Sequence, residues 1–237
     1  NVTVEEFIHP ATGAQHLHLQ CDNPENVFMV ALRTVPEDST GVAHILEHTV
    51  LCGSENYPVR DPFFMMLRRS LNTFMNAFTS SDWTAYPFAT QNRKDFSNLL
   101  SVYLDAVFFS RLDPLDFAQE GHRIELANKD PDAPLVYKGV VFNEMKGAMS
   151  SVSSVLWDRL CFELFPTSTY HHNSGGDPEA IPDLSYDQLM AFYKGHYHPS
   201  NAILLTFGNL PVSQHHDVFE REALGRFEKS SEHIEVG

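Results

Sequence analysis

Residues 41–53 read Gly41-Val-Ala-His-Ile-Leu-Glu-His-Thr-Val-Leu-Cys-Gly53. The stretch predicts a short helix, with Thr40 as its N-cap and Gly53 just past its end. Residues at i, i+3 and i+4 are neighbours on a helix surface, so His44, Glu47 and His48 share one face. The two imidazoles on that face can therefore reach a single cation, and the Glu47 carboxylate points at whatever else the cation binds.

The order His-x-x-Glu-His is the inverted zincin motif, which is typical of zinc hydrolases. A hydrolytic zinc needs three protein ligands and one open position, so a further ligand has to come from elsewhere in the chain. The best candidate is Glu144, which follows the breaker at residues 131–134 and lies in the opening turns of an expected long helix. A carboxylate there would complete a His2Glu set.

Many short segments of the chain resemble the pitrilysin/insulysin family of zinc metallopeptidases, and within it the presequence-protease (falcilysin-like) branch. The segments that carry this resemblance are Asp38-Ser-Thr-Gly41, His44-Ile-Leu-Glu-His48, Leu51-Cys-Gly-Ser54, Ser70-Leu-Asn-Thr-Phe-Met-Asn-Ala-Phe-Thr79, Val102-Tyr-Leu-Asp-Ala106, Lys138-Gly-Val-Val-Phe-Asn-Glu-Met-Lys-Gly147, Ser174-Gly-Gly-Asp-Pro178 and His196-Tyr-His-Pro-Ser-Asn201. They are spread over nearly the whole chain.

The resemblance implies a zinc-dependent endopeptidase that hydrolyses unstructured peptides, such as cleaved targeting peptides. It implies that one Zn²⁺ is held by His44, His48 and Glu144, and that Glu47 is the general base on a zinc-bound water. Residues Asn76, Ala77, Phe78 and Thr79 would form the edge strand along which the substrate lies, a recognition mode that uses backbone hydrogen bonds.

The resemblance also implies partners outside these residues. Enzymes of this branch consist of four related domains in two halves, and the far half supplies an Arg and a Tyr to the site. We therefore expect residues 1–237 to form a single N-terminal zinc-peptidase domain that is weakly active or inactive alone. Its partners would be peptide substrates and the remaining domains of the full-length enzyme.

One position departs from the pattern of other members of the family. Many of them carry an acidic residue seven positions before the ligand glutamate, where this chain has Tyr137. Carboxylates beside metal ligands orient them and tune the metal. Glu120 or Asp82 would have to replace it, and the sequence does not choose between them.

Two other classes of function stay open on these residues. The first is a metal-binding or non-catalytic scaffold domain of the same fold, against which the intact His44, Glu47, His48 and Glu144 argue. The second is a zinc lyase of the S-ribosylhomocysteinase type, which shares the inverted motif but uses a cysteine ligand.

The composition is that of a globular domain with one sizeable core: 43% of the 237 residues are hydrophobic and 12% are aromatic. Cys21, Cys52 and Cys161 have neither a C-x-x-C spacing nor an even count, which favours buried thiols in a reducing compartment. The bacterial cytoplasm, the mitochondrial matrix and the plastid stroma all fit. The first residue is Asn1 and not Met, so a targeting peptide is expected to be missing from the sequence.

The net charge of −15 argues against nucleic acid as a partner, because its phosphates would be repelled. No apolar run approaches the roughly 18 residues that cross a bilayer, so we expect no membrane partner. A basic peptide is the natural complement to such a charge, although many acidic proteins are acidic only for solubility.

Patterning predicts an α+β fold, a largely antiparallel sheet with helices packed mainly on one face. The expected strands are residues 14–20 paired with 27–33, 74–79 paired with 83–90 around the turn at 80–82, and 202–207. Helices are expected from residue 62 onward, around 96–108, and at 114–127, 136–161 and 185–195. The helical spacing of Phe96, Leu99, Leu100, Tyr103, Leu104, Val107 and Phe108 marks a core stripe.

The remaining histidine pairs have no apparent third ligand nearby that would complete a metal site. We interpret His196 and His198, expected on a strand, as structural residues. The adjacent pairs His171-His172 and His215-His216 are expected to lie at the surface.

Overall fold

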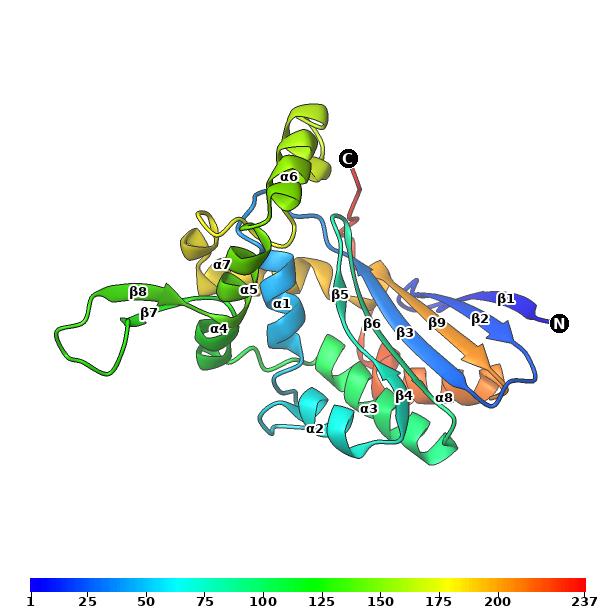
Figure 1. Cartoon of the computed structure of the whole chain (residues 1–237). Coiled ribbons are helices and arrows are strands. Elements are labelled where there is room, and N and C mark those ends of the chain that lie inside the picture. The colour runs from blue at the N-terminus through cyan, green and yellow to red at the C-terminus, as the bar shows by residue number, and fades with distance from the viewer.

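A seven-stranded, largely antiparallel sheet forms the centre of the protein in the computed structural model, which describes residues 1–237 (Figure 1). Six strands follow the order β1-β2-β9-β3-β6-β4, and β5 also pairs with β6. Their bounds are β1 Thr3–Ile8, β2 Gln15–Gln20, β3 Asn26–Arg33, β4 Asn72–Met75, β5 Phe78–Thr79, β6 Trp83–Thr90 and β9 Ala202–Gly208. The prediction of a largely antiparallel α+β domain is confirmed.

The expected pairing of residues 14–20 with 27–33 is wrong. Strand β9 lies between β2 and β3, parallel to the first and antiparallel to the second. Its near-continuous run of apolar residues, each buried or half-buried, suits a central strand with neighbours on both sides. Periodicity identified the strands but could not assign neighbours that are distant in sequence.

Helices cover one face of the sheet, and the other face stays half-open. On β3 the side chains of Phe28, Val30 and Leu32 are buried, whereas the residues between them are only partly buried. The helices are α1 Val42–Val50, α2 Pro62–Arg69, α3 Arg93–Phe108, α4 Pro114–Glu120, α5 Val140–Ala148, α6 Val152–Leu164, α7 Tyr186–His196 and α8 Val212–Glu222. None of them combines the length and apolar character that crossing a bilayer requires.

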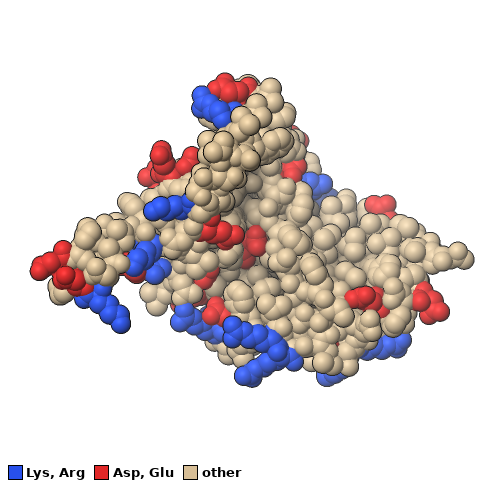
Figure 2. Space-filling model, viewed as in Figure 1, with Lys and Arg blue, Asp and Glu red and all other residues tan.

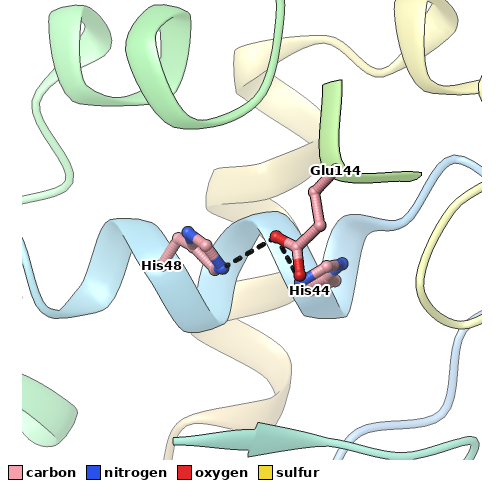
Figure 3. A group of neighbouring side chains, drawn as sticks. All are labelled: His44, His48 and Glu144. Atoms are coloured by element: carbon pink, nitrogen blue, oxygen red, sulfur yellow. Dashed lines mark ion pairs between the residues drawn. The ribbon is translucent and has the colours of Figure 1, made fainter. Parts of the chain in front are cut away.

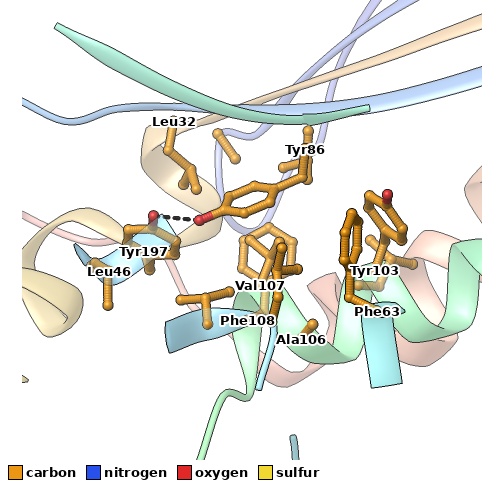
Figure 4. Packing of buried hydrophobic residues seen from close by; sticks show 14 of the residues in the cluster. Leu32, Leu46, Phe63, Tyr86, Tyr103, Ala106, Val107, Phe108 and Tyr197 are labelled. Atoms are coloured by element: carbon orange, nitrogen blue, oxygen red, sulfur yellow. Dashed lines mark hydrogen bonds between the residues drawn. The ribbon is translucent and has the colours of Figure 1, made fainter. Parts of the chain in front are cut away.

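The core lies between this helical layer and the sheet, and α3 supplies the predicted apolar stripe. Figure 4 shows Tyr86 of β6 meeting Tyr197 across the core, where their hydroxyls are joined by a 2.7 Å hydrogen bond. Burial raises the pKa of both phenols well above the ordinary value. The pair therefore stays neutral and ties the end of α7 to the centre of the sheet.

Two expected helices are interrupted. The helix expected at 114–127 stops at Glu120, because Gly121 follows it and Arg123–Leu126 then forms strand β7. The helix expected at 136–161 is a short strand, β8 (Leu135–Lys138), followed by α5 and α6, which a turn at Met149–Ser151 separates. By contrast, the helix expected at 185–195 is confirmed as α7, whose start is closed by a capping box between Ser185 and Gln188.

Two elements project from the body on the side of α1 (Figure 1). One is the hairpin of β7 and β8, and the other is α6, none of whose residues is buried. Trp157 and Leu156 of α6 expose 69% and 59% of their surface, so this helix owes little of its position to core packing.

Four histidines form a cluster between β2 and α8. His16 and His18 of β2 are both within hydrogen-bonding distance of the Thr206 hydroxyl, at 2.8 and 2.6 Å. His16 also bonds to His216 (3.0 Å), and His215 is buried beside them with no partner for its Nε2. The expectation that His215 and His216 lie at the surface is therefore wrong for His215, which faces inward because α8 itself was not predicted.

Acid should destabilise the protein through this histidine cluster. Burial, then the neighbouring histidines, lowers the pKa of His16 to about 3 and that of His215 to about 4. Nearby Asp217 acts on His216 in the opposite direction, and His9 is already bonded to Glu220. Because the unfolded chain takes up these protons near pH 6.5, the stabilisation is complete above that pH and is lost as pH falls towards 4.

The free energy of unfolding of the wild-type protein should fall between about pH 7.5 and pH 5. We expect His215→Leu to make this fall smaller by on the order of 2 kcal/mol. Urea unfolding at the two pH values measures this loss. His233→Gln, at an exposed site near the C-terminus, is the matched control and should leave the wild-type pH dependence unchanged. An equal pH dependence in wild type and His215→Leu would contradict the assignment.

Candidate metal centre

Helix α1 carries the motif histidines and begins at a crowded point. Its N-cap is Gly41, at φ 72°, and not Thr40, whose hydroxyl donates to Asp38 instead. A Cβ on Gly41 would lie 2.8 Å from the Cα of Gly176, so only glycine lets residues 175–176 pack against the helix start. The helix ends at Val50, three residues before the predicted stop at Gly53.

Helix α5 brings the distant glutamate to α1. Its N-cap is Gly139, where a Cβ would lie 1.9 Å from the carbonyl oxygen of Gly121 at the end of α4. This close approach, together with packing of α4 on both α1 and α5, holds Glu144 over the histidine face. Glu144 thus lies on a nine-residue helix and not on the long one expected.

Figure 3 shows His44, His48 and Glu144 converging on one point. The Nε2 atoms of His44 and His48 lie 3.8 and 3.9 Å from the same oxygen, Oε2 of Glu144. All three ligand atoms lie within 4.8 Å of one another. Ligand atoms about 2.0–2.1 Å from one tetrahedral ion stand roughly 3.3 Å apart, so the group needs only a small contraction to hold a metal ion.

Both histidines offer the correct nitrogen, because their other nitrogens are engaged. His44 Nδ1 donates to the carbonyl oxygen of Gly175 at 2.9 Å, and His48 Nδ1 bonds to Oε2 of Glu120 at 3.1 Å. Such partners orient a ligating imidazole and leave Nε2 free for the metal. Glu120 is therefore the carboxylate that replaces the missing acidic residue at Tyr137, whereas Asp82 accepts a hydrogen bond from Tyr170 and takes no part.

The charges of the site are coupled. Burial alone would lower the pKa of His48, but the hydrogen bond to Glu120 and the charges of Glu47, Glu120 and Glu144 raise it above the ordinary value. Burial would likewise raise the pKa of Glu120, which the bonds from His48 and Gln119 instead lower. The hydrogen bond between Glu120 and His48 thus links the charges of these two side chains next to the group of His44, His48 and Glu144.

Glu47 lies beside the histidines and is held from the sheet. Its side chain is almost fully buried, and its Oε2 accepts a 2.6 Å hydrogen bond from the hydroxyl of Thr79. The sequence assigned Thr79 only to the substrate strand and missed this contact. To predict the contact between Thr79 and Glu47, one would need to know that a strand with a hydroxyl residue packs directly on α1. That packing is known only from the fold.

The expected strand at residues 74–79 is broken into β4 and β5, with Asn76 and Ala77 between them. Both strands pair only with β6, so their other edge is unpaired and β5 packs on α1. Asn76 and Phe78 are exposed, and Ala77 and Thr79 are half-buried. The free backbone edge of these four residues therefore runs past Glu47.

A hollow of about 240 Å³ opens beside the histidines, and we call it the Phe63 hollow. It is mainly apolar, and its lining includes Glu47, His48, Phe63, Phe64, Leu67, Met75, Asn76 and Ala77. Figure 2 shows acidic side chains in the recessed middle of this face, beneath the projecting α6, with basic side chains mostly towards the margins.

The other histidines are engaged elsewhere. His196 ends α7, bonds to Phe192 and stacks on its ring, and His198 accepts a hydrogen bond from the backbone of Ser200. Neither lies on a strand, and both have structural contacts. His171 bonds to the carbonyl oxygen of Phe162, and both His171 and His172 are partly buried.

A helix with the inverted motif, a glutamate from a second helix and an open sheet edge define the class of inverted-motif metallopeptidases. Comparison with known families agrees: the insulinase (peptidase family M16) model matches residues 33–148, and the M16 inactive-domain model matches residues 183–236. The chain belongs to the M16 peptidase family.

Within that family, the chain is similar to proteins named mitochondrial presequence protease. That of Danio rerio is 57% identical over 236 residues, which are 99% of this chain and 23% of the relative. That of Saccharomyces cerevisiae is 51% identical over 212 residues, 89% of this chain and 21% of the relative. The chain thus spans less than a quarter of the length of these relatives.

Solved structures show the same fold. The crystal structure of a protease from Helicobacter pylori superposes with a TM-score of 0.78 at 19% identity, over 100% of this chain and 53% of that one. A putative M16-like peptidase from Alicyclobacillus acidocaldarius gives a TM-score of 0.75 at 18% identity, over 98% of this chain and 51% of that one.

Proposed function

We propose that the chain is the zinc-binding domain of a metalloendopeptidase that hydrolyses unstructured peptides, such as cleaved targeting peptides. The observation that carries the proposal is the convergence of His44, His48 and Glu144 around one point, with Glu47 held beside it. One Zn²⁺ bound there would polarise the scissile carbonyl and lower the pKa of a coordinated water.

The protein's own groups account for the remaining steps. Glu47 takes the proton of the attacking water and returns it to the leaving amine, and Thr79 holds the carboxylate in place for both transfers. The edge of Asn76, Ala77, Phe78 and Thr79 pairs with the peptide backbone, which orients the scissile bond without reading its sequence. The Phe63 hollow accepts an apolar side chain next to that bond.

The remaining parts of this proposal concern what lies outside the chain. Residues 1–237 would be the N-terminal domain of a four-domain enzyme, in line with the small share of its relatives that they cover. The relatives' mitochondrial names favour the mitochondrial matrix as the compartment, and three free cysteines suit its reducing conditions.

A zinc lyase is a weaker alternative because it would need a thiolate ligand. Cys52, which lines the same hollow as His48, donates its S–H to the backbone carbonyl oxygen of His48 at 3.5 Å. Burial, then the charge of Glu120, raises the pKa of this thiol far above its usual range. Glu144 would fill the third ligand position instead.

The affinity for zinc should fall in two variants of the chain, and it should fall further in the second than in the first. Glu120→Gln should weaken zinc binding about 10- to 100-fold, the usual effect of losing a hydrogen-bonding partner of a ligand. Glu144→Gln should weaken it more, because an anionic ligand itself is lost. Competition with a chromophoric chelator measures these affinities.

Glu6→Gln is the matched control for that series, because it removes one negative charge at an exposed site on β1, at the opposite edge of the sheet from β4. Its zinc affinity should equal that of wild type. Unchanged affinity in Glu144→Gln would exclude Glu144 as a ligand.

A further inference from the structure

A second hollow, of about 440 Å³, lies at the opposite end of β5 from the Phe63 hollow. We call it the Trp157 hollow. Helices α5 and α6, residues 170–174 and the turn after β5 enclose it. Its lining is Ser81, Met145, Ala148, Met149, Ser153, Ser154, Trp157, Asp158, Cys161, Tyr170, His172, Asn173 and Ser174.

The Trp157 hollow is built on the same elements as the metal-binding group. Met145 follows Glu144 on α5, and Ser174 precedes Gly175, whose carbonyl oxygen binds His44. The segment 77–81, which contains β5, runs from Ala77 in one hollow to Ser81 in the other, and Thr79 between them bonds to Glu47. An extended peptide advancing about 3.3 Å per residue along this edge places side chains over each hollow in turn.

The chemistry of the Trp157 hollow suits a cation. It contains the carboxylate of Asp158, the largely exposed indole of Trp157 and no Lys or Arg. The nearest guanidinium, on Arg159, is paired with Glu163 at 2.7 Å and stacked on Phe162. The hydroxyl of Tyr170, another lining residue, donates a hydrogen bond to Asp82 at 2.9 Å, so a second carboxylate lies behind the Tyr170 side of the hollow.

The Asp158 carboxylate lacks a full counter-charge. Burial, then repulsion from Asp177, raises its pKa above the ordinary value, despite a hydrogen bond from Asn173 and the more distant charge of Arg159. The only basic side chain in the lining is His172, and burial, then the charge of His171, lowers its pKa although Asp38 and Glu37 act in the opposite direction. A bound cation would relieve this repulsion.

Resting on the proposed peptidase function, we propose that the Trp157 hollow is a specificity subsite for an arginine side chain of the peptide. The planar guanidinium would bond to the Asp158 carboxylate and stack on the Trp157 indole, two interactions that arginine makes better than lysine. The net charge of −15 adds long-range attraction for such basic peptides.

The test compares peptide pairs that differ at one position, arginine against citrulline, which has nearly the same shape without the charge. Full-length protein is assayed, the variable position is moved residue by residue along the peptide, and mass spectrometry identifies the bond cleaved. At one position we expect kcat/KM to be on the order of 10-fold higher for arginine, the scale of a charge-assisted hydrogen bond.

Asp158→Asn should reduce that ratio to below about 2-fold, chiefly by lowering kcat/KM for the arginine peptide. Trp157→Leu should reduce the ratio about 3-fold, through loss of the stacked ring. Glu179→Gln, which removes one exposed charge outside the hollow, should retain the full ratio.

The possible results distinguish a failure of the subsite proposal from a failure of the proposed peptidase activity. The subsite alone would be overturned if cleavage depends on Glu47 but Asp158→Asn leaves the arginine-to-citrulline ratio unchanged. It would also be overturned if cleavage depends on Glu47 but no position of the peptide shows an arginine preference. Cleavage that survives Glu47→Gln would overturn the proposed catalytic role before the subsite is considered.

Discussion

Glu47→Gln is expected to lower turnover at least about 100-fold in the full-length protein while zinc stays bound. Loss of a general acid or base typically costs about 100- to 10,000-fold. The amide oxygen of glutamine still accepts the hydrogen bond from Thr79, so the side chain keeps its position and loses only its ability to take a proton. A quenched fluorescent peptide measures kcat, and metal analysis of the same sample measures the zinc.

Metal content distinguishes this result from a damaged site. Glu144→Gln should lose zinc and activity together, because Glu144 Oε2 lies within 4 Å of both histidine Nε2 atoms. Glu47→Gln should lose activity alone. Turnover near the wild-type level in Glu47→Gln would mean that another group activates the water.

The second large effect concerns residues 1–237 on their own, which we expect to fold and bind zinc yet cleave peptides only marginally. The metal-binding group is open on one side: the side chain of Glu144 is 55% exposed, whereas that of His44 is 13% exposed. By resemblance, an Arg and a Tyr from the far half would stabilise the developing oxyanion. Loss of one such donor costs on the order of 100- to 1,000-fold in rate, and loss of substrate positioning adds to it.

Matched assays of the isolated chain and the full-length protein, both with measured zinc content, test this expectation. Adding the remaining domains in trans should restore cleavage if the halves associate. Robust cleavage by the isolated chain, abolished by Glu47→Gln, would show that the rest of the protein is dispensable for catalysis.

Local spacing predicted the part of the site that one helix carries. His44, Glu47 and His48 share a face because helix geometry alone places them there. Glu144 could be proposed only as a carboxylate on a later helix, and its position depends on the contact between Gly139 and Gly121.

The partners of these residues could not be predicted in the same way. The choice of Glu120 over Asp82 depends on α4 packing against α1, and the carbonyl oxygen of Gly175 reaches His44 through a loop distant in sequence. Both are tertiary contacts with no periodic signature. Residues 41–53, by contrast, encode their helix locally.

The same limit explains the errors in the fold. Apolar alternation identified β3 and a buried apolar run identified β9, but their neighbours depend on long-range pairing, so β9 was not placed between β2 and β3. The stretch 136–161 has few strong breakers, and the end of α5 near Gly147 depends on local turns that composition indicates only weakly.

The broken edge of the sheet has a consequence for how the protein avoids aggregation. An unpaired strand edge is a template for further strands, and cross-β stacking needs an uninterrupted segment of about six or seven residues. Here the edge consists of β4 and the two-residue β5, separated at Asn76 and Ala77, with a register shift between Asn72 and Phe74. If this edge pairs with peptides as proposed, it can hold a short stretch of backbone while being too short and irregular to seed a fibril from the peptides that it binds.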